Sequence, residues 1–170
     1  MHSSHETILP DRTDQARLWV IPLEGTQPDL QNLLAQVQLF LEEWTSHGRA
    51  IESSATLDSN RFLLIAGEIA GGTISGCGID ALMNAVEEIS EHHHCRILSS
   101  MFIYYRSEHG GVDFSSRSQF RKLIAQNLIF PETSIFNPGI HTLNALRGGE
   151  FELPLCDSVY ARIFRIPATA

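Results

Sequence analysis

The stretch EIAGGTISGCGIDALM, residues 68–83, combines four glycines with a cysteine and leads into a segment with helical spacing. Such a loop could hold a phosphate on its backbone amides, or it could activate the thiol of Cys77. A phosphate-binding P-loop needs a lysine and then a serine or threonine after its last glycine. Here Cys77 and Gly78 follow Gly76 instead. We therefore do not expect the protein to be an ATPase.

A dinucleotide-binding turn is also disfavoured. Residues 76–81 fit the pattern G-x-G-x-x-A, but in that fold the first glycine follows its strand directly, so that the turn is tight. Eight residues separate Gly67, which ends an apolar run, from Gly76. The surrounding sequence also shows no repeated strand-helix-strand pattern, and we expect no nucleotide cofactor.

Cys77 allows two interpretations. In the first turn of a helix, unpaired amides and the helix dipole stabilise a thiolate, and a nearby histidine would complete the minimum for a nucleophile. Otherwise the cysteine is a small apolar filler where the glycines bring the loop close to a sheet, and we favour this interpretation. His47 is the candidate base, although its position before Gly48 also suits a C-terminal helix cap, which we prefer. The candidate ligand-binding residues belong to this loop and the end of the preceding helix: Gly71, Gly72, Ser75, Gly76, Cys77, Gly78, Trp44 and Arg49.

The run His92-His93-His94, followed by Cys95, contains residue types that bind metals. Adjacent residues of a helix point about 100° apart, so these side chains cannot all converge on one ion. Basic groups in the last turn of a helix are also common, because they interact favourably with the helix dipole. We therefore expect no metal site and no other cofactor.

Composition excludes several functional classes. A chain of 170 residues with 43% hydrophobic and 19% charged residues is that of a folded globular protein. Its net charge of -8 disfavours nucleic-acid binding, and its apolar runs are far shorter than the ~20 residues that span a bilayer. The polar N-terminal stretch lacks the order of a secretory signal, and three cysteines predict no disulfide framework. We expect a reduced, cytoplasmic protein that binds neither nucleic acid nor membranes.

Several elements can be predicted along the first half of the chain. Residues 1–15 are polar, and we expect a mobile N-terminal arm. Residues 16–23, ARLWVIPL, have the β-branched and aromatic content of a strand. Apolar residues then recur at spacings of three and four, which predicts a helix over 28–47, with Pro28 in its first turn and Gly48 just past its end.

The next elements complete a repeating order. Residues 50–57 and 61–68 flank a turn-forming cluster, DSN, and predict a β-hairpin. A second amphipathic helix is expected from about residue 76 to residue 94, and ILSSMFIYY, residues 97–105, predicts a further strand. Strand, helix, strand, strand, helix, strand is the order of the ferredoxin-like fold, a two-layer α+β core. In that fold the first and third strands are central, and these two are the most continuously apolar.

We expect a single α+β domain over residues 16–170, with the ferredoxin-like core over 16–105 and a C-terminal extension over 106–170. In the extension, Ser116 and Gln119 form a capping box that opens a helix reaching Leu128, and SVYARIFRI, residues 158–166, predicts a final strand. A ferredoxin-like sheet exposes one face, so this extension must cover it within the chain or pair with a neighbour. We expect a homodimer.

Four segments occur in the same order, at similar spacing, as in a known group. RLWVI, FLEEWTSHG, NRFLLIAGE and SGCGIDA resemble small bacterial proteins that are often labelled ABC transporter ATPases, and the similarity covers residues 16–130. The resemblance implies an uncharacterised family whose label the residues contradict, because the Walker A lysine and Walker B aspartate are missing. The group is more serine-rich where this chain has Gly78 and Ala81, which argues against a hydroxyl-based role for the loop.

No complete catalytic constellation can be read from these residues. We therefore expect a non-catalytic cytosolic module that binds a small molecule or a protein partner. The alternative is a thiol-dependent enzyme that uses Cys77 at a helix N-terminus, with His47 as its base.

Overall fold

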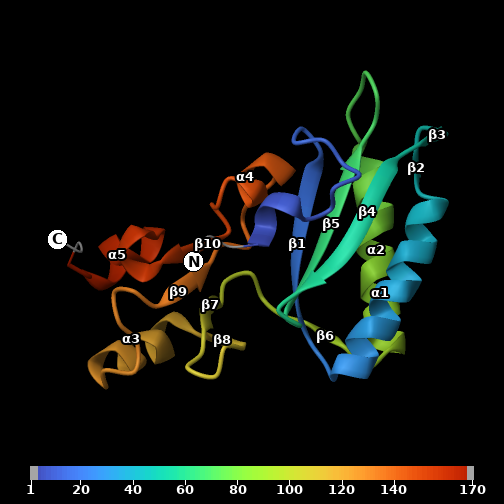
Figure 1. Cartoon of the computed structure of the whole chain (residues 1–170). Helices are drawn as coiled ribbons and strands as arrows, with labels where there is room; N and C mark the ends of the chain where they lie inside the picture. Colours follow the sequence, from blue (N-terminus) through green and yellow to red (C-terminus); the bar gives the residue numbers. More distant parts are fainter. Residues whose placement is uncertain (1–3, 168–170) are drawn as a thin grey trace.

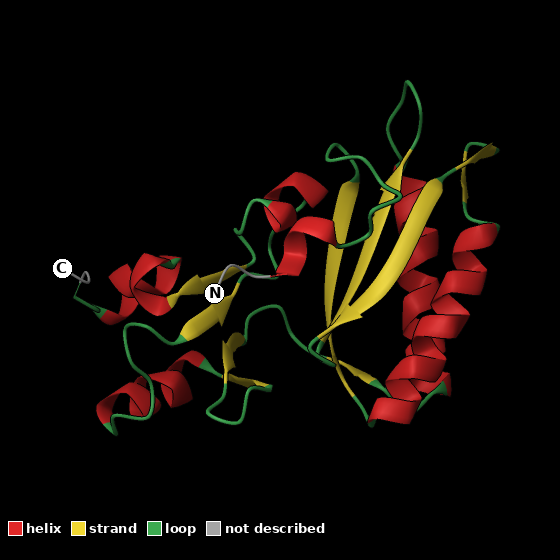
Figure 2. Cartoon of the chain, viewed as in Figure 1, coloured by secondary structure: helices red, strands yellow, loops and turns green. Residues whose placement is uncertain are grey.

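The computed structural model describes residues 4–167 and has the predicted mixed α+β character (Figures 1 and 2). Its first sheet has the strand order β4-β5-β1-β6, and all neighbours are antiparallel. Strands β1 (Arg17–Glu24) and β5 (Phe62–Glu68) are central, as their apolar sequences predict. Strand β4 (Glu52–Asp58) forms one edge, and the short β6 (Arg96–Ile97) forms the other.

Two helices cover one face of the first sheet (Figure 1). Helix α1 (Gln27–Glu42) begins at the predicted position, where the Thr26 hydroxyl accepts a hydrogen bond from the amide of Asp29. Ser75 caps helix α2 (Gly76–His92) in the same way, because its hydroxyl accepts a hydrogen bond from the amide of Gly78. Their apolar stripes bury residues against the sheet, as the helical spacing predicts: Leu30, Leu33, Val37 and Leu41 from α1, and Leu82 and Val86 from α2.

A second sheet, of order β10-β9-β7-β8, packs on the opposite side of the first. Its strands are β7 (Ile103–Arg106), β8 (Val112–Ser115), β9 (Ser134–Phe136) and β10 (Glu152–Pro154). A core between the sheets joins Phe62 and Leu64 of the first to Tyr104, Phe136 and neighbouring Phe151. Helix α4 (Leu143–Arg147) and the 3-10 helix η1 (Ser4–Thr7) border this core.

A third core lies on the outer side of the second sheet. Helix α3 (Arg117–Ala125) contributes Phe120, and helix α5 (Val159–Phe164), which follows the 3-10 helix η2 (Leu155–Asp157), contributes Tyr160 and Phe164. The Ser116 hydroxyl caps α3 by accepting from the amide of Gln119, so half of the predicted capping box is present. The layers are thus helices, first sheet, second sheet and helices.

The first helix is shorter than predicted. It ends at Glu42, not at residue 47, and the chain continues as a small ribbon of β2 (Thr45–Ser46) and β3 (Arg49–Ala50). His47 and Gly48 form the two-residue turn between these strands, both at positive φ (51° and 73°), as a type I′ hairpin turn requires. His47 is therefore not a helix cap, and that prediction is wrong.

The predicted strand over residues 97–105 is divided between the two sheets. Residues 96–97 pair with β1, and the chain then turns at Ser99 before β7 begins at Ile103. The Ser99 hydroxyl accepts from the amide of Met101, and its carbonyl accepts from Phe102 and from the Tyr104 hydroxyl. Serine side chains favour such local turns over continued strand pairing.

The predicted strand over residues 158–166 is wrong, because this segment contains α5. Ser158 caps the helix through its hydroxyl, which accepts from the amide of Tyr160. Tyr160 and Phe164, four residues apart, both pack on the outer core, which matches helical spacing. Val159, an apolar residue that favoured the strand prediction, is 74% exposed and does not belong to a buried strand face.

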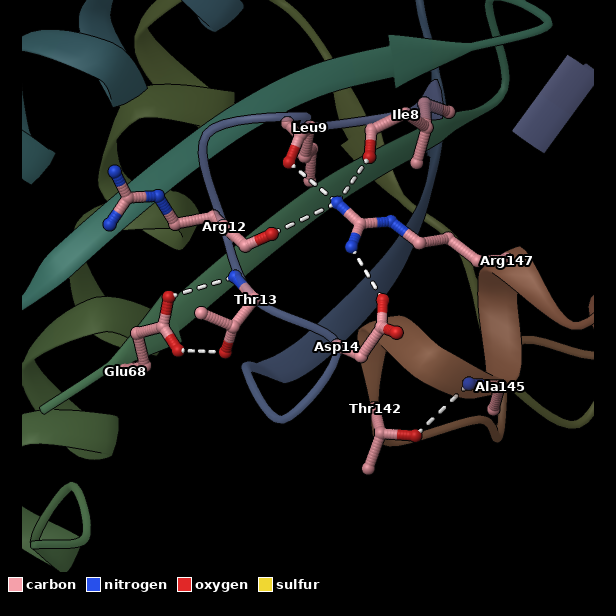
Figure 3. A network of polar contacts seen from close by, with 9 residues as sticks. All are labelled: Ile8, Leu9, Arg12, Thr13, Asp14, Glu68, Thr142, Ala145 and Arg147. Carbon is pink, nitrogen blue, oxygen red and sulfur yellow. Dashed lines mark hydrogen bonds and ion pairs between the residues drawn. The ribbon is translucent and has the colours of Figure 1, made fainter. Parts of the chain in front are cut away.

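The described part of the N-terminal arm is packed on the molecule, which differs from the free arm expected over residues 1–15, of which residues 1–3 lie outside the described residues. Leu9 belongs to the core between the sheets, and η1 lies beside α4 (Figure 1). Arg147 of α4 donates to the carbonyls of Ile8, Leu9 and Arg12 and to the carboxylate of Asp14 (Figure 3). By donating to three carbonyls, the guanidinium holds residues 8–12 in place, although this segment contains no regular helix or strand.

The second face of the first sheet is covered within the same chain, which was one of the two predicted ways to bury it. The covering residues come from the second sheet, α4 and the arm rather than from Val159 and its neighbours. Homodimer formation stays a prediction.

Among residues 4–167, no helix combines the length and the apolar content needed to span a membrane.

The contacts of Arg147 generate a stability prediction. Arg147→Met retains most of the apolar stem but leaves three arm carbonyls without their donor, so we expect a loss of about 2–3 kcal/mol in the free energy of unfolding. Urea unfolding measures the loss, and amide exchange should accelerate at residues 8–14. Arg96→Met is the matched control, since its exposed pair with Glu24 should contribute less than about 1 kcal/mol. Equal stability of the two variants would contradict the assignment.

Candidate functional site

The glycine-rich loop, residues 69–75, joins the end of β5 to the start of α2 and is held by the β2–β3 ribbon. The indole Nε1 of Trp44, just before the ribbon, donates to the carbonyl of Gly78 at 2.8 Å. Arg49 of β3 donates from Nη2 to the carbonyl of Ala70 at 2.5 Å. Trp44 and Arg49 therefore contact the start of α2 and the loop, respectively.

Two serines connect the ribbon to the helix start. The buried Ser46 hydroxyl accepts from the amide of Ser75 at 2.9 Å and donates to the Ser75 hydroxyl at 2.9 Å. The Ser75 hydroxyl also accepts from the amide of Gly78 at 3.1 Å. These internal bonds use the Ser75 groups that a bound phosphate would otherwise engage. The loop thus has a structural role at its helix end.

Glycine allows close packing at two positions. A Cβ on Gly67 would lie 2.9 Å from the Trp44 ring, and one on Gly78 would lie 3.2 Å from Ile74. The glycines therefore admit an indole and an isoleucine beneath the loop. Packing therefore accounts for Gly67 and Gly78 without any ligand, and the positive φ of 69° accounts for Gly71.

Cys77 does not serve as a filler beneath the loop, and that favoured prediction is wrong. Its side chain is exposed, and Ile74 packs against Gly78 where the cysteine was expected. His47 is also exposed, at the tip of the ribbon. Within residues 4–167, no hydrogen bond joins His47 to Cys77. The predicted Cys–His pair is thus not assembled in this structure.

A cavity of about 250 Å³ opens on one side of the loop. Of the predicted ligand-binding residues, Gly72 lines it, whereas Gly71, Ser75, Gly76, Cys77, Gly78, Trp44 and Arg49 do not. The lining residues come from the start of β1, the end of β5 and the loop: Gln15, Arg17, Gly67, Glu68, Ile69, Gly72, Thr73 and Ile74.

Arg17 is the functional candidate that the sequence analysis missed. Its guanidinium carbon lies 5.0 Å from the centre of the Trp19 ring, within the range of a cation–π contact. In the described part of the chain it has no ion pair with a carboxylate, in contrast to Arg12, Arg106 and Arg147. A signal was present in the sequence, because Arg17 and Trp19 alternate along one face of a predicted strand.

Glu68 lies beside this cavity and is tied to the arm (Figure 3). Its carboxylate accepts from the Thr13 amide at 3.0 Å and from the Thr13 hydroxyl at 2.5 Å. Burial by itself would raise the pKa of Glu68, but these hydrogen bonds and the charges of Arg12 and Arg147 outweigh it and lower the pKa. The carboxylate therefore stays ionised and keeps the arm against β5.

Residues 4–167 contain no group of three His, Cys, Asp or Glu side chains placed to hold a metal ion. The histidine triplet lies at the end of α2, where His93 is the C-terminal cap and His94 has a positive φ of 55°. These residues terminate the helix.

No family model, curated protein or solved structure matches this chain. The resemblance to the small bacterial group therefore rests on its four motifs alone.

The contacts of Glu68 generate a prediction about acid stability. A folded pKa below the unfolded value of about 4.3 means that the carboxylate stabilises the fold fully above that pH, and that this stabilisation is lost as the pH falls through the folded pKa. Thr13→Val removes the hydroxyl donor, so the pKa of Glu68 should rise and the acid dependence of stability should weaken. Carboxyl ¹³C NMR titration measures this, with Thr45→Val as control. An unchanged Glu68 titration in Thr13→Val would refute the assignment.

Proposed function

We propose that this chain is a non-catalytic binding module whose small-molecule site is the cavity beside the glycine-rich loop. The observation that carries the proposal is Arg17, a residue that lines the cavity and whose guanidinium has no carboxylate partner among the described residues. Stacking on Trp19 limits its motion, so the cation is positioned before a ligand arrives. An arginine so placed is suited to an anion.

The cavity favours a small carboxylate over a phosphate. A guanidinium binds one carboxylate through two parallel hydrogen bonds, whereas a phosphate dianion calls for further cations. Among residues 4–167, Arg17 is the only Lys or Arg that lines this cavity. Gln15 and Thr73 add polar contacts, while Ile69 and Ile74 form an apolar wall. The ionised Glu68 also lines the cavity, but Thr13 and the charges of Arg12 and Arg147 offset its charge, so the ligand carboxylate is placed at Arg17. A volume of about 250 Å³ is below that of typical drug-sized sites. The proposed ligand is therefore a short aliphatic carboxylate.

We also propose that β1, α1, β4, β5, α2 and β6 form a ferredoxin-like unit. The antiparallel order β4-β5-β1-β6, with both helices on one face, supports this assignment. The second sheet then replaces the solvent or the neighbouring subunit that would otherwise meet the other face.

Titration with sodium butanoate, followed by amide and guanidinium ¹⁵N NMR, tests the carboxylate site. We expect saturable shifts at the Gly72 amide and at Arg17 Nε, and at least about tenfold weaker binding in Arg17→Gln, because the bidentate charged contact is lost. Arg96→Gln serves as the control, since Arg96 is exposed and does not line the cavity. Inorganic phosphate should not compete. Absence of shifts at Gly72, or equal binding by Arg17→Gln, would contradict the proposal.

A thiol-dependent enzyme is the second candidate, because Cys77 is exposed in the first turn of the 17-residue helix α2. Against it stands the lack of contact with His47. Native-state alkylation with iodoacetamide, read by mass spectrometry, separates the two candidates. We expect Cys95 to react slowest, since its burial blocks access and raises its pKa. Cys77 should react at the same rate in the wild type and in His47→Ala. A large loss of Cys77 reactivity in His47→Ala would favour the enzyme.

A further inference from the structure

A groove of about 830 Å³ runs along the outer edge of β4 and belongs to neither of the sites discussed above. Residues 51–56 form its floor, residues 7–12 of the arm form one wall, and Gln38, Leu41 and Glu42 of α1 form the other. Figure 1 shows β4 at the edge of the first sheet, with α1 beside it. The groove therefore gives access to the one side of β4 that has no neighbouring strand.

The backbone of β4 presents unused hydrogen-bonding groups to this groove. The Gln38 side chain donates to the carbonyl of Ala55 at 3.2 Å, so Ala55 faces away from β5. In an antiparallel ladder, the N–H and C=O of one residue point to the same side, and alternate residues share that side. The amides of Ser53, Ala55 and Leu57 thus face outward, and in the described chain none of them donates a hydrogen bond to another residue.

Three common devices that protect an exposed edge, namely a bulge, a proline and a lysine, are missing from β4, although Glu52 and Asp58 are charged. Its register with β5 is continuous from Glu52 to Asp58, without a bulge, and its sequence ESSATLD contains no proline and no lysine. An unprotected edge is a template for another strand. Such an edge, seven residues long, is sufficient for strand addition by an extended peptide.

Arg12 provides a second, independent feature in the wall of the groove. Its side chain is 16% exposed, and its Nη1 lies 3.4 Å from the carboxylate of Glu52. Its Nε–H is buried and has no acceptor in the structure. A buried donor without a partner is uncommon and destabilising, so the wall of the groove is incompletely satisfied at Arg12.

The negative charge of the groove favours a basic segment as its binding partner. Asp11 and Glu42 line the groove and have no ion pair among residues 4–167, and the whole chain carries a net charge of -8. A second copy of the chain is a poor occupant, because antiparallel pairing of two β4 strands about Ala55 would place Glu52 opposite Asp58 of the other copy. From these observations we propose that the edge of β4 binds an extended, basic segment of a partner protein as an added strand.

Fluorescence anisotropy with a labelled probe tests the proposal. The probe is acetyl-Lys-Thr-Val-Lys-Val-Thr-Lys-amide, and its acidic twin has glutamate in place of lysine. The basic probe should bind at least about tenfold more tightly than its twin. Asp11→Asn combined with Glu42→Gln should remove most of this preference, whereas Asp80→Asn combined with Glu87→Gln on the surface of α2, the matched control, should retain it.

Backbone pairing is tested separately. Ala55→Pro removes an outward N–H without disturbing the ladder to β5, so binding should weaken at least about tenfold. If that variant does not fold, a probe N-methylated at alternate residues gives the same test on the wild-type chain, and it should lose binding. The proposal is overturned if neither probe binds, if both bind equally, or if the N-methylated probe binds as tightly as the original. Self-association through β4, seen by sedimentation and abolished by Ala55→Pro, would also overturn it.

Discussion

The aromatic contacts of Phe62 are the interaction on which the rest of this structure depends. Its ring lies 5.4 Å from that of Tyr104, 5.2 Å from Phe136 and 5.1 Å from Phe151, so one residue of β5 meets three that come from the second half of the chain. A sheet with helices on one face leaves the other face apolar and exposed. Burying that face under aromatic side chains joins the two halves, because each such ring removes a large apolar area from water.

That packing also explains why the N-terminal arm is ordered. Leu9 belongs to the same core between the sheets as Phe62, and α4, which borders this core, places Arg147 within reach of the arm carbonyls. Thr13 then engages Glu68 at the end of β5, beside the cavity of the glycine-rich loop. A wall of the β4 groove, too, is made by this arm. The arm therefore links the central core to both proposed binding surfaces.

Patterns that depend on local residues were predictable from the sequence, whereas pairings between distant segments were not. The apolar stripes of α1 and α2 and the DSN turn, with positive φ at Ser59 and Asn60, follow from spacing and turn chemistry. The end of α1 was predicted too late in the sequence because the helical spacing of apolar residues continues to Trp44. In the structure Trp44 lies beyond the helix, and its indole donates a hydrogen bond to the carbonyl of Gly78, 34 residues away. The candidate site was likewise predictable only in part. The glycines in the sequence indicated the position of the loop, but only the structure showed that Arg17 lines a cavity and has no carboxylate partner within the described residues.

The glycine-rich loop illustrates why a motif of this kind is weak evidence for a ligand. The hydroxyl and amide of Ser75 and the amides of Gly72 and Gly78, which could cradle a phosphate, are bonded to other groups of the protein. Hydrogen-bonding capacity that is already used cannot contribute to recognition without first being broken. Among the described residues, unused capacity suited to the proposed ligands lies at the guanidinium of Arg17 and at the outward amides of β4. At those groups, unlike at Ser75, a ligand could form hydrogen bonds without first breaking bonds within the protein.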